Sequence, residues 1–397
     1  MPTNLIGRRA VLGGAASLAP VLAAPRARAA DTKPLRIGIL TDETGPYTDS
    51  GGRGSVLAAR MAIADEGAQG VEILHADTQN KPDVAASVAR QWYDSGVDMV
   101  TDLPVTSIAS AVQQVAKEKQ RTVIITAAAS TFLTARDCNP YSSHWADDTH
   151  ALSVGPTTQV LRAGGRKWYF ITVDYVFGTA MEKAASAVIT GGGGQVLGAA
   201  RYPLGTQDYS SMLVQAQSSG ADVVGLASVG NDLVNLVKQA GEFGISAHQR
   251  LVGFLIYITE VHALGLKAAQ GFTFASSFYW DQNDTARAFS RRFLKEHGGM
   301  PTRNHAAIYA ACRHFIRASA TAGTRDALAI GRAMRAMPVD YLGVPATLRV
   351  DGRLIYDLAL WRVKTPAESH GAWDYYTRLA TIPAAEAFLP VTPACKG

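Results

Sequence analysis

Short apolar runs alternate with amphipathic segments along the first part of the chain. The runs are rich in β-branched residues and predict buried strands, whereas the segments between them place apolar residues at helical spacing. The predicted strands are Leu35–Leu40, Val71–Ala76, Asp98–Asp102 and Thr122–Thr126, and the predicted helices are Ser55–Glu66, Asp83–Asp94 and Ser107–Lys119. Strands about thirty residues apart or closer, alternating with helices, are typical of parallel β-α-β units.

The same pattern then starts again. The second set of predicted strands is Trp168–Val173, Gln195–Arg201, Ala221–Ala227 and Arg250–Ile256, and the helices between them are Thr179–Ile189, Ser210–Ser218 and Asp232–Phe243. Gly191–Gly194 follows a helix and lacks the Lys-Ser/Thr of a phosphate-binding loop, so it reads as a turn. Two later helices, Asp284–His297 and Asn304–Ala322, bring no new strand series and are expected to pack onto an existing lobe. The pattern predicts two successive doubly wound α/β units.

The N-terminus has the features of an export signal. Residues 1–30 contain Arg8-Arg9, an apolar stretch from Val11 to Leu22, and Ala27-Arg28-Ala29 as a small-x-small cleavage site. The paired arginines favour the twin-arginine route, and an ordinary secretory signal is the alternative. The apolar stretch is shorter than the roughly 20 residues that span a bilayer, and no Cys near the cleavage site supports a lipid anchor. We therefore expect a periplasmic protein without direct membrane insertion.

The export signal accounts for most of the net positive charge. The chain has 38 basic and 33 acidic residues, and the first 30 residues hold four arginines and no acid. After their removal 34 basic and 33 acidic residues remain. A nearly neutral chain gives no reason to expect nucleic acid or an anionic membrane as a partner. The roughly 367 residues left exceed one ordinary core, which also favours two lobes.

Three cysteines suggest one disulfide and one free thiol in an oxidising compartment. Cys138 lies in a polar loop and Cys395 in the C-terminal tail, whereas Cys312 falls inside an apolar helical pattern where a buried thiol is common. We expect a Cys138–Cys395 bridge with a structural role. No metal site is expected, because Cys312 and His314 are two residues apart on a helix and point in different directions.

The loops after the strands carry the functional signal. In open parallel sheets, ligands bind beyond the carboxyl ends of the strands, where helix N-termini offer unpaired N–H groups. The first-unit loops are small and hydroxylic, which suits a carboxylate: Thr44–Tyr47, Pro104–Ser107 and Ala127–Ser130. The second-unit loops offer aromatic faces: Asp174–Gly178, Ser228–Asn231 and Tyr257–Thr259. Each loop taken singly also fits an ordinary turn or N-cap.

Several of these segments together resemble a known family. Arg36–Tyr47 followed by Gly51-Gly52, then Asp77–Asp83, Asp174–Gly178 and Trp373–Tyr376, look like the type I periplasmic binding proteins, the branched-chain amino acid receptor family of ABC importers. The matches favour the branch associated with aromatic and other non-amino-acid carboxylates. The resemblance runs from about Leu35 to the C-terminus.

The resemblance implies two Rossmann-like lobes joined by three crossovers, with the ligand trapped by hinge closure. The first lobe would comprise residues 31–150 and 276–345, and the second residues 151–275 and 346–397. The final strand, near Tyr356–Val363, would lie in the second lobe. The expected partners are a small-molecule ligand and the permease subunits of an ABC importer, and a monomer is expected.

Site residues follow from the resemblance position by position. Thr106 and the loop Ala128–Ser130 match the family's carboxylate-holding positions, Tyr47 its first-loop contact, and Phe177 the aromatic residue that covers the ligand. The strand-end loops add further candidate ligand-binding residues, which are Val105, Ser107, Ala127, Tyr175, Ser228, Asn231 and Tyr257.

One position departs from the family pattern. The amino-acid receptors usually place an acidic residue after the fourth strand of the second lobe, where it pairs with the ligand ammonium. Here that loop reads Leu255–Thr259, apolar or aromatic, although Glu260 lies close enough to leave the alignment open. A desolvated ammonium without a counter-charge is costly. The departure favours an aromatic or short apolar carboxylate, such as a benzoate or cinnamate derivative, over leucine, and a branched-chain or other amino acid is the alternative.

Acidic and basic residues that could form an enzyme site occur near residue 147. Asp147-Asp148 with His150, or His144 beside Trp145, are candidate acid–base pairs, but no Gly-x-Ser-x-Gly or His-Glu-x-x-His motif occurs. This stretch falls at the expected first crossover, so solvated polar roles are expected. We expect no catalysis and no cofactor. A sensory ligand-binding domain on the same fold is a further alternative, and it would need a separate partner chain.

Overall fold

The computed structural model describes residues 1–3 and 34–395. Its first sheet has five parallel strands in the order β2-β1-β3-β4-β5. The strands are β1 (Leu35–Thr41), β2 (Val71–Asp77), β3 (Met99–Asp102), β4 (Thr122–Ile125) and β5 (Ser142–His144). Every residue of β3 and β4 is buried, as expected where helices cover both faces of a parallel sheet.

Helices connect these strands in the predicted alternation. They are α1 (Gly52–Asp65), α2 (Pro82–Asp94) and α3 (Thr106–Lys119), and the short 3₁₀ turn η1 (Thr131–Thr134) follows β4. Three later helices belong with this sheet, because α10 and α11 contact α1 and α12 contacts α11. These are α10 (Asp284–His297), α11 (Arg303–Ala322) and α12 (Ala327–Ala336). The expectation that the later helices pack onto an existing lobe is confirmed.

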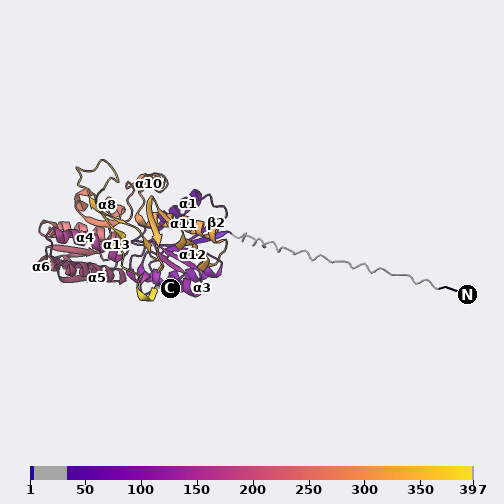
Figure 1. Ribbon diagram of the computed structural model, residues 1–397. Helices are drawn as coiled ribbons and strands as arrows, with labels where there is room; N and C mark the ends of the chain where they lie inside the picture. Colours follow the sequence, from indigo (N-terminus) through magenta and orange to yellow (C-terminus); the bar gives the residue numbers. More distant parts are fainter. Residues whose placement is uncertain (4–33, 396–397) are drawn as a thin grey trace. The chain divides into compact units, whose positions relative to one another are not determined.

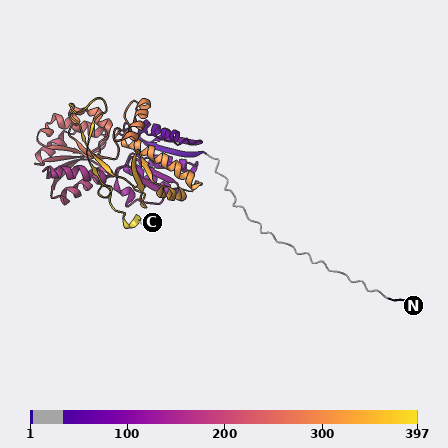
Figure 2. The same ribbon diagram turned by 45° about the horizontal axis from the view of Figure 1, so that its top comes forward.

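The second sheet has four parallel strands in the order β7-β6-β8-β9. Its strands are β6 (Lys167–Val173), β7 (Gln195–Tyr202), β8 (Val223–Ala227) and β9 (Arg250–Gly253). The helices are α4 (Thr149–Arg162), α5 (Val176–Gly191), α6 (Ser210–Ser218), α7 (Gly230–Glu242), η2 (Ile245–Ala247), α8 (Ile258–Leu264) and α9 (Leu266–Ala269). Among the described residues, α4, α5 and α6 form one group and α1, α11 and α12 another, in both views (Figures 1 and 2).

The chain passes between the two groups three times, as the resemblance implies. It crosses from β5 to α4, from β10 (Thr273–Ser276) to α10, and from β13 (Leu354–Ile355) to β14 (Leu358–Val363). The predicted fold class of two doubly wound lobes with three crossovers is confirmed. The exact lobe boundaries at residues 150, 275 and 345 stay a prediction.

The C-terminal third contains antiparallel strands, of which the sequence pattern predicts only one. One small sheet has the order β10-β14-β15, with β15 at Tyr376–Ile382, and another comprises β11 (Val339–Tyr341), β12 (Val344–Leu348) and β13. The predicted strand near Tyr356–Val363 exists as β14, but it is not the final one. Strand β15 returns beside it through a loop, and α13 (Ala384–Ala387) and η3 (Pro393–Cys395) complete the chain.

Helix α4 and strand β5 were not among the predicted elements, and one predicted strand was too long. Helix α4 contains Pro156, whose missing N–H argues against a helix in sequence, and the three-residue β5 is too short to show a period. The predicted strand Arg250–Ile256 ends at Gly253, because Tyr257 then forms the N-cap of α8.

Cys138 and Cys395 form a disulfide across 257 residues, with their Cα atoms 6.0 Å apart. This is the pair expected from the sequence. Cys312 is buried with a free thiol, and burial raises its pKa to about 12. Among the described residues, none of the helices is both long and apolar enough to cross a membrane. Nearly all of the predicted export signal, residues 4–30, lies outside the described residues.

Candidate functional site

A cavity lies where the carboxyl edges of the two parallel sheets meet. Its volume is about 20 Å³, room for about one water molecule. Side chains and backbone from both lobes line it: Tyr47, Ser50, Pro104, Thr106, Ala127, Ala129, Tyr175, Phe177, Val229, Leu255, Tyr257 and Asn304. Residues of both lobes therefore meet around one small cavity.

The first-lobe wall is built around the start of α3. Asp102 and Leu103 have φ angles of 81° and 66°, so the chain turns sharply after β3 and brings Thr106 to the cavity. No side chain caps this helix, whose N-cap is Val105. The Thr106 hydroxyl is buried and makes no hydrogen bond within the described chain. Free first-turn N–H groups together with this hydroxyl favour an anionic group.

Tyr47 reaches the cavity on a loop that Asp42 holds in shape. The Asp42 carboxylate accepts hydrogen bonds from the backbone N–H groups of Gly45 (2.7 Å) and Tyr47 (2.9 Å) and from the Asn80 amide (2.9 Å). A Cβ at Gly45 would lie 2.4 Å from that Asn80 amide nitrogen, so a larger residue would displace the side chains that hold the turn. The Tyr47 position is therefore fixed by the loop and does not depend on a ligand.

Aromatic rings form the second-lobe wall. Tyr175 is the N-cap of α5, and Phe177 lies in its first turn with its ring centre 5.9 Å from that of Tyr175. A Cβ at Gly178 would lie 2.0 Å from the Val173 carbonyl oxygen, so only glycine lets α5 begin this close to β6. Tyr257, after β9, completes the aromatic surface.

The two walls touch each other in this structure. The hydroxyl groups of Tyr47 and Tyr175 lie 2.7 Å apart, and they belong to different lobes. At Gly230, whose φ is 67°, a Cβ would lie 2.8 Å from the Pro46 carbonyl oxygen. Burial raises the pKa of Tyr47 and of Tyr175, so both side chains are neutral hydrogen-bonding groups. The cleft is closed.

Glu260 does not reach the cavity. Its carboxylate accepts hydrogen bonds from the backbone N–H of Gly230 (2.5 Å) and of Tyr257 (2.8 Å), and it lines a neighbouring hollow. Burial raises its pKa to about 8. Among the described lining residues none carries a carboxylate or a basic group. An ammonium group in the cavity would find no counter-charge.

Similarity to known proteins agrees with this geometry. Residues 34–371 match the model of the periplasmic binding protein family, which covers most of the chain. The chain belongs to the periplasmic binding protein family. It is 40% identical to a periplasmic binding protein from Burkholderia mallei, with 90% of this chain and 96% of that chain covered and a TM-score of 0.88.

Other relatives are named for amino acids. A branched chain amino acid ABC transporter periplasmic ligand-binding protein from Burkholderia xenovorans LB400 is 37% identical, with 90% of this chain and 97% of that chain covered and a TM-score of 0.80. The Leu/Ile/Val-binding protein homolog 6 of Brucella abortus (strain 2308) is 27% identical over 50% of this chain. This match spans about half, 52%, of the Brucella protein's length.

Six of the twelve predicted ligand residues line the cavity of this periplasmic binding protein, and they come from both sheet edges: Tyr47, Thr106, Ala127, Tyr175, Phe177 and Tyr257. Ser107 lines an open groove beside α5, and Asn231 lines the hollow that Glu260 also lines. Whether any of the twelve contacts a ligand stays a prediction.

The other four predicted residues have structural partners. Val105 is the N-cap of α3, and the Ala128 carbonyl accepts a hydrogen bond from His144 at 2.6 Å. Ser130 caps η1 through the Phe132 N–H, and Ser228 accepts a hydrogen bond from Tyr202. These positions support the loops that carry the lining residues.

Six more residues line the cavity, and two of them, Ser50 and Asn304, lie outside every loop named from the sequence. The other four lie within named loops but were not singled out: Pro104, Ala129, Val229 and Leu255. Asn304 lies in the first turn of α11, and its amide lies 3.1 Å from the Tyr257 hydroxyl. The rule that ligands bind beyond the carboxyl ends of parallel strands does not point to α11, because α11 follows no strand of either parallel sheet. In the sequence, Asn304 is marked only as the polar residue that begins the predicted helix Asn304–Ala322.

Three of the candidate acid–base residues, His144, Asp147 and Asp148, are buried, which corrects the expectation of solvated roles. His150 is partly exposed, and its Nε2 lies 3.2 Å from the Glu386 carbonyl oxygen. Asp147 accepts hydrogen bonds from the Ser277 N–H (3.0 Å) and the Tyr356 hydroxyl (2.7 Å), and Asp148 caps α4. His144 donates from Nε2 to the Ala128 carbonyl, and its Nδ1 lies 2.9 Å from Arg353 Nη1. Burial and Arg353 lower the His144 pKa, so the ring is neutral. These groups hold the crossovers together.

The described residues contain no group of three or more His, Cys, Asp or Glu side chains that could hold a metal ion.

Proposed function

We propose that this periplasmic binding protein binds a small organic carboxylate with an aromatic or apolar body and delivers it to the permease subunits of an ABC importer. One observation carries the proposal. The uncapped start of α3, with the unpartnered Thr106 hydroxyl, faces aromatic rings in a cavity whose described lining has no charged side chain. A carboxylate fits the first feature and an apolar body fits the second.

An amino acid is the second candidate, because the relative from Burkholderia xenovorans is named for branched-chain amino acids. The position of Glu260 argues against it. Both of its oxygens are bonded to backbone N–H groups, so pairing with a ligand ammonium would break existing hydrogen bonds. Burying an unpaired ammonium costs several kcal/mol.

A thermal-shift comparison of the exported protein tests the choice. We expect benzoate or cinnamate to raise the melting temperature more than leucine or valine, because a ligand at 100 times its Kd stabilises the native state by about 2.7 kcal/mol. Benzamide is the matched control, since it keeps the ring and loses the negative charge. Stabilisation by leucine or valine and not by the aromatic acids would refute the aromatic assignment.

We further propose that the protein binds its ligand without converting it. We also propose that it acts in the periplasm as a monomer. Recovery of an added ligand unchanged after prolonged incubation tests the first point, and fractionation of cells tests the second. A pull-down that returns a signalling protein in place of permease subunits would favour the sensory alternative.

A further inference from the structure

A second cavity lies on the other side of Tyr257. Its volume is about 10 Å³, room for one water-sized group, and Tyr257 is the one residue that lines both cavities in the described chain. The residues around it come from the segment after β9, the end of β10 and the segment after it, the α10–α11 loop with the start of α11, and the start of β15. They are Ile256, Tyr257, Ile258, Ser276, Phe278, Tyr279, Trp280, Pro301, Thr302, Arg303 and Tyr376. The two cavities are therefore neighbours with a single side chain shared between them.

Two buried donors in this second cavity lack partners. The Arg303 side chain is 4% exposed, and its Nη1 lies 3.4 Å from Asp147, but its Nε makes no hydrogen bond within the described chain. The buried Tyr376 hydroxyl is likewise without a partner among the described residues. Buried donors are nearly always hydrogen-bonded, because leaving one unsatisfied costs free energy. The pair indicates a place for an acceptor atom.

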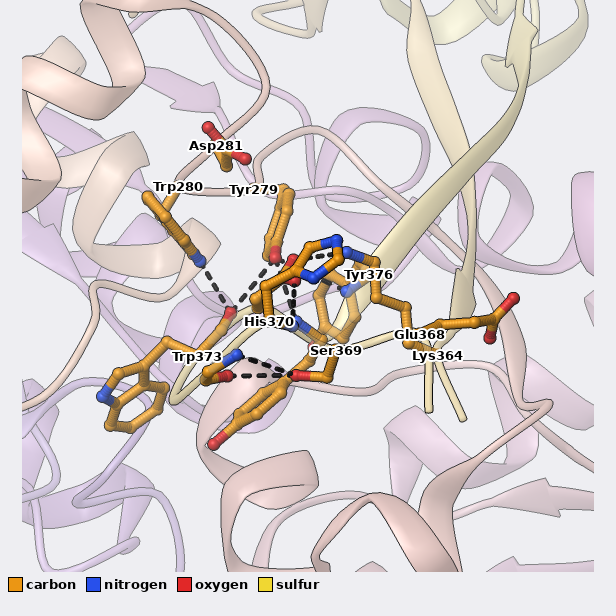
Figure 3. Close-up of polar contacts among 12 residues, drawn as sticks. Tyr279, Trp280, Asp281, Lys364, Glu368, Ser369, His370, Trp373 and Tyr376 are labelled. Carbon is orange, nitrogen blue, oxygen red and sulfur yellow. Dashed lines mark hydrogen bonds and ion pairs between the residues drawn. The ribbon is translucent and has the colours of Figure 1, made fainter. Parts of the chain in front are cut away.

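The aromatic walls of this cavity are held in position. The Tyr279 hydroxyl and the Trp280 indole N–H both donate to the Trp373 carbonyl, at 3.1 and 2.8 Å (Figure 3). The backbone N–H groups of Tyr375 and Tyr376 in turn donate to the Tyr279 hydroxyl. Rings fixed in this way form a preorganised surface for a planar molecule.

The charges around Arg303 determine which kind of acceptor can bind in this second cavity. The Arg303 guanidinium lies over the Tyr257 ring, 4.8 Å from its centre, and faces Asp147. Behind them Arg353 and Asp148 form a second buried pair at 3.7 Å. The cluster is already neutral, so a second carboxylate would bring an uncompensated buried charge. A neutral oxygen satisfies the two donors without that cost.

We propose that the Arg303 cavity receives the end of the ligand opposite its carboxylate, and that this end carries a neutral oxygen acceptor such as a phenolic hydroxyl. The ligand is then an oxygen-substituted aromatic acid that lies along Tyr257, with the oxygen at Arg303 and Tyr376. This inference rests on the proposed function, because the carboxylate end is assigned to α3.

Matched ligand pairs test the inference by titration calorimetry on the exported protein. The probes are benzoate with 4-hydroxybenzoate, and cinnamate with 4-hydroxycinnamate, which differ within each pair by one hydroxyl. We expect the hydroxylated acid of at least one pair to bind more tightly, and Tyr376→Phe to reduce that affinity ratio about fivefold, the effect of one hydrogen bond. Arg303→Lys keeps the charge beside Asp147 but removes Nε, and it should reduce the ratio as well.

Tyr209→Phe is the matched control. Tyr209 is also a buried tyrosine without a hydroxyl partner in the described chain, but it lines neither cavity, so the ratio should stay unchanged. Equal binding of both members of each pair, or a ratio that Tyr376→Phe leaves unchanged, would overturn the inference and indicate that an ordered water satisfies the two donors. Binding of benzoate or cinnamate without selectivity would leave the proposed function intact, whereas no binding of any aromatic acid would refute that function itself.

Discussion

The carboxyl edges of the two parallel sheets face one cavity but bring different chemistry to it. At the first edge, α3 begins uncapped at Thr106 beside the small residues Ala127 and Ala129. At the second edge, the rings of Phe177 and Tyr257 line the cavity. Both edges are made by the same strand-to-helix connection, so the difference lies in the side chains. Topology places the site, and the loop residues divide it into a polar and an apolar half.

The two edges also differ in the pKa of the buried carboxyl group that lies beside each of them. Asp102, at the end of β3, is buried beside the hydroxyls of Thr41 and Ser55, and burial raises its pKa to about 6. Glu260, behind the second edge, has its pKa raised by burial to about 8 while it holds two backbone N–H groups. The second edge therefore contains the group that titrates at the higher pH, on the alkaline side of neutral.

The largest expected effect comes from removing the polar group of the first edge. Thr106→Val should weaken binding of an aromatic carboxylate by about 10- to 100-fold, because a hydrogen bond to a charged group contributes about 1.5–3 kcal/mol. Titration calorimetry measures this. Thr157→Val is the control, since Thr157 is also buried with an unpartnered hydroxyl in the described chain but lies on α4 away from the cavity. Unchanged affinity in Thr106→Val would show that the first edge does not hold the carboxylate.

The second prediction separates the two carboxylates by pH. The folded protein holds a proton on Glu260 up to about pH 8, whereas the unfolded chain loses it near 4.5, so stability should fall as pH rises toward 8 and then level off. From pH 6.5 to 8.5 the expected loss is about 2 kcal/mol in the free energy of unfolding. Glu260→Gln should remove this slope in urea titrations.

Asp102→Asn is the control for that slope. The Asp102 window lies between its ordinary value of 3.8 and about 6, so the variant should leave the change between pH 6.5 and 8.5 intact. A slope lost in Asp102→Asn and retained in Glu260→Gln would reverse the assignment of the two edges.

The smallest expected effect concerns the contact that joins the edges. Tyr47→Phe and Tyr175→Phe should each reduce the free energy of unfolding by about 1 kcal/mol, because each removes one partner of the same hydroxyl pair. The double variant should cost no more than either single one, which a double-mutant cycle measures. Additive losses would mean that the hydroxyls act independently and that the edges are not coupled there.

The local sequence pattern was enough to predict both parallel sheets and half of the residues that line the cavity. Buried runs such as Met99–Asp102 are short and apolar throughout, and the loops after them are marked by Thr106 or Phe177. The antiparallel strands β10 and β15 were missed because their pairing with β14 depends on segments up to about a hundred residues away. Nothing within either segment encodes that partner.

The remaining site residues depend on tertiary contacts. Asn304 and Arg303 open α11, and only the packing of α11 on α1 brings them to the cleft. The role of Glu260 was ambiguous in sequence, because a carboxylate three residues after an N-cap can bind a ligand or cap its own helix. The structure shows the cap.

The Cys138–Cys395 disulfide has a mechanical consequence. It joins the C-terminal tail to the loop after η1, in the lobe where the described fold begins at β1. A force applied to the two ends of the folded chain is therefore carried by residues 34–138 and the sulfur–sulfur bond. Residues 139–394, including the whole second sheet and all three crossovers, lie outside this covalent load path while that bond is intact.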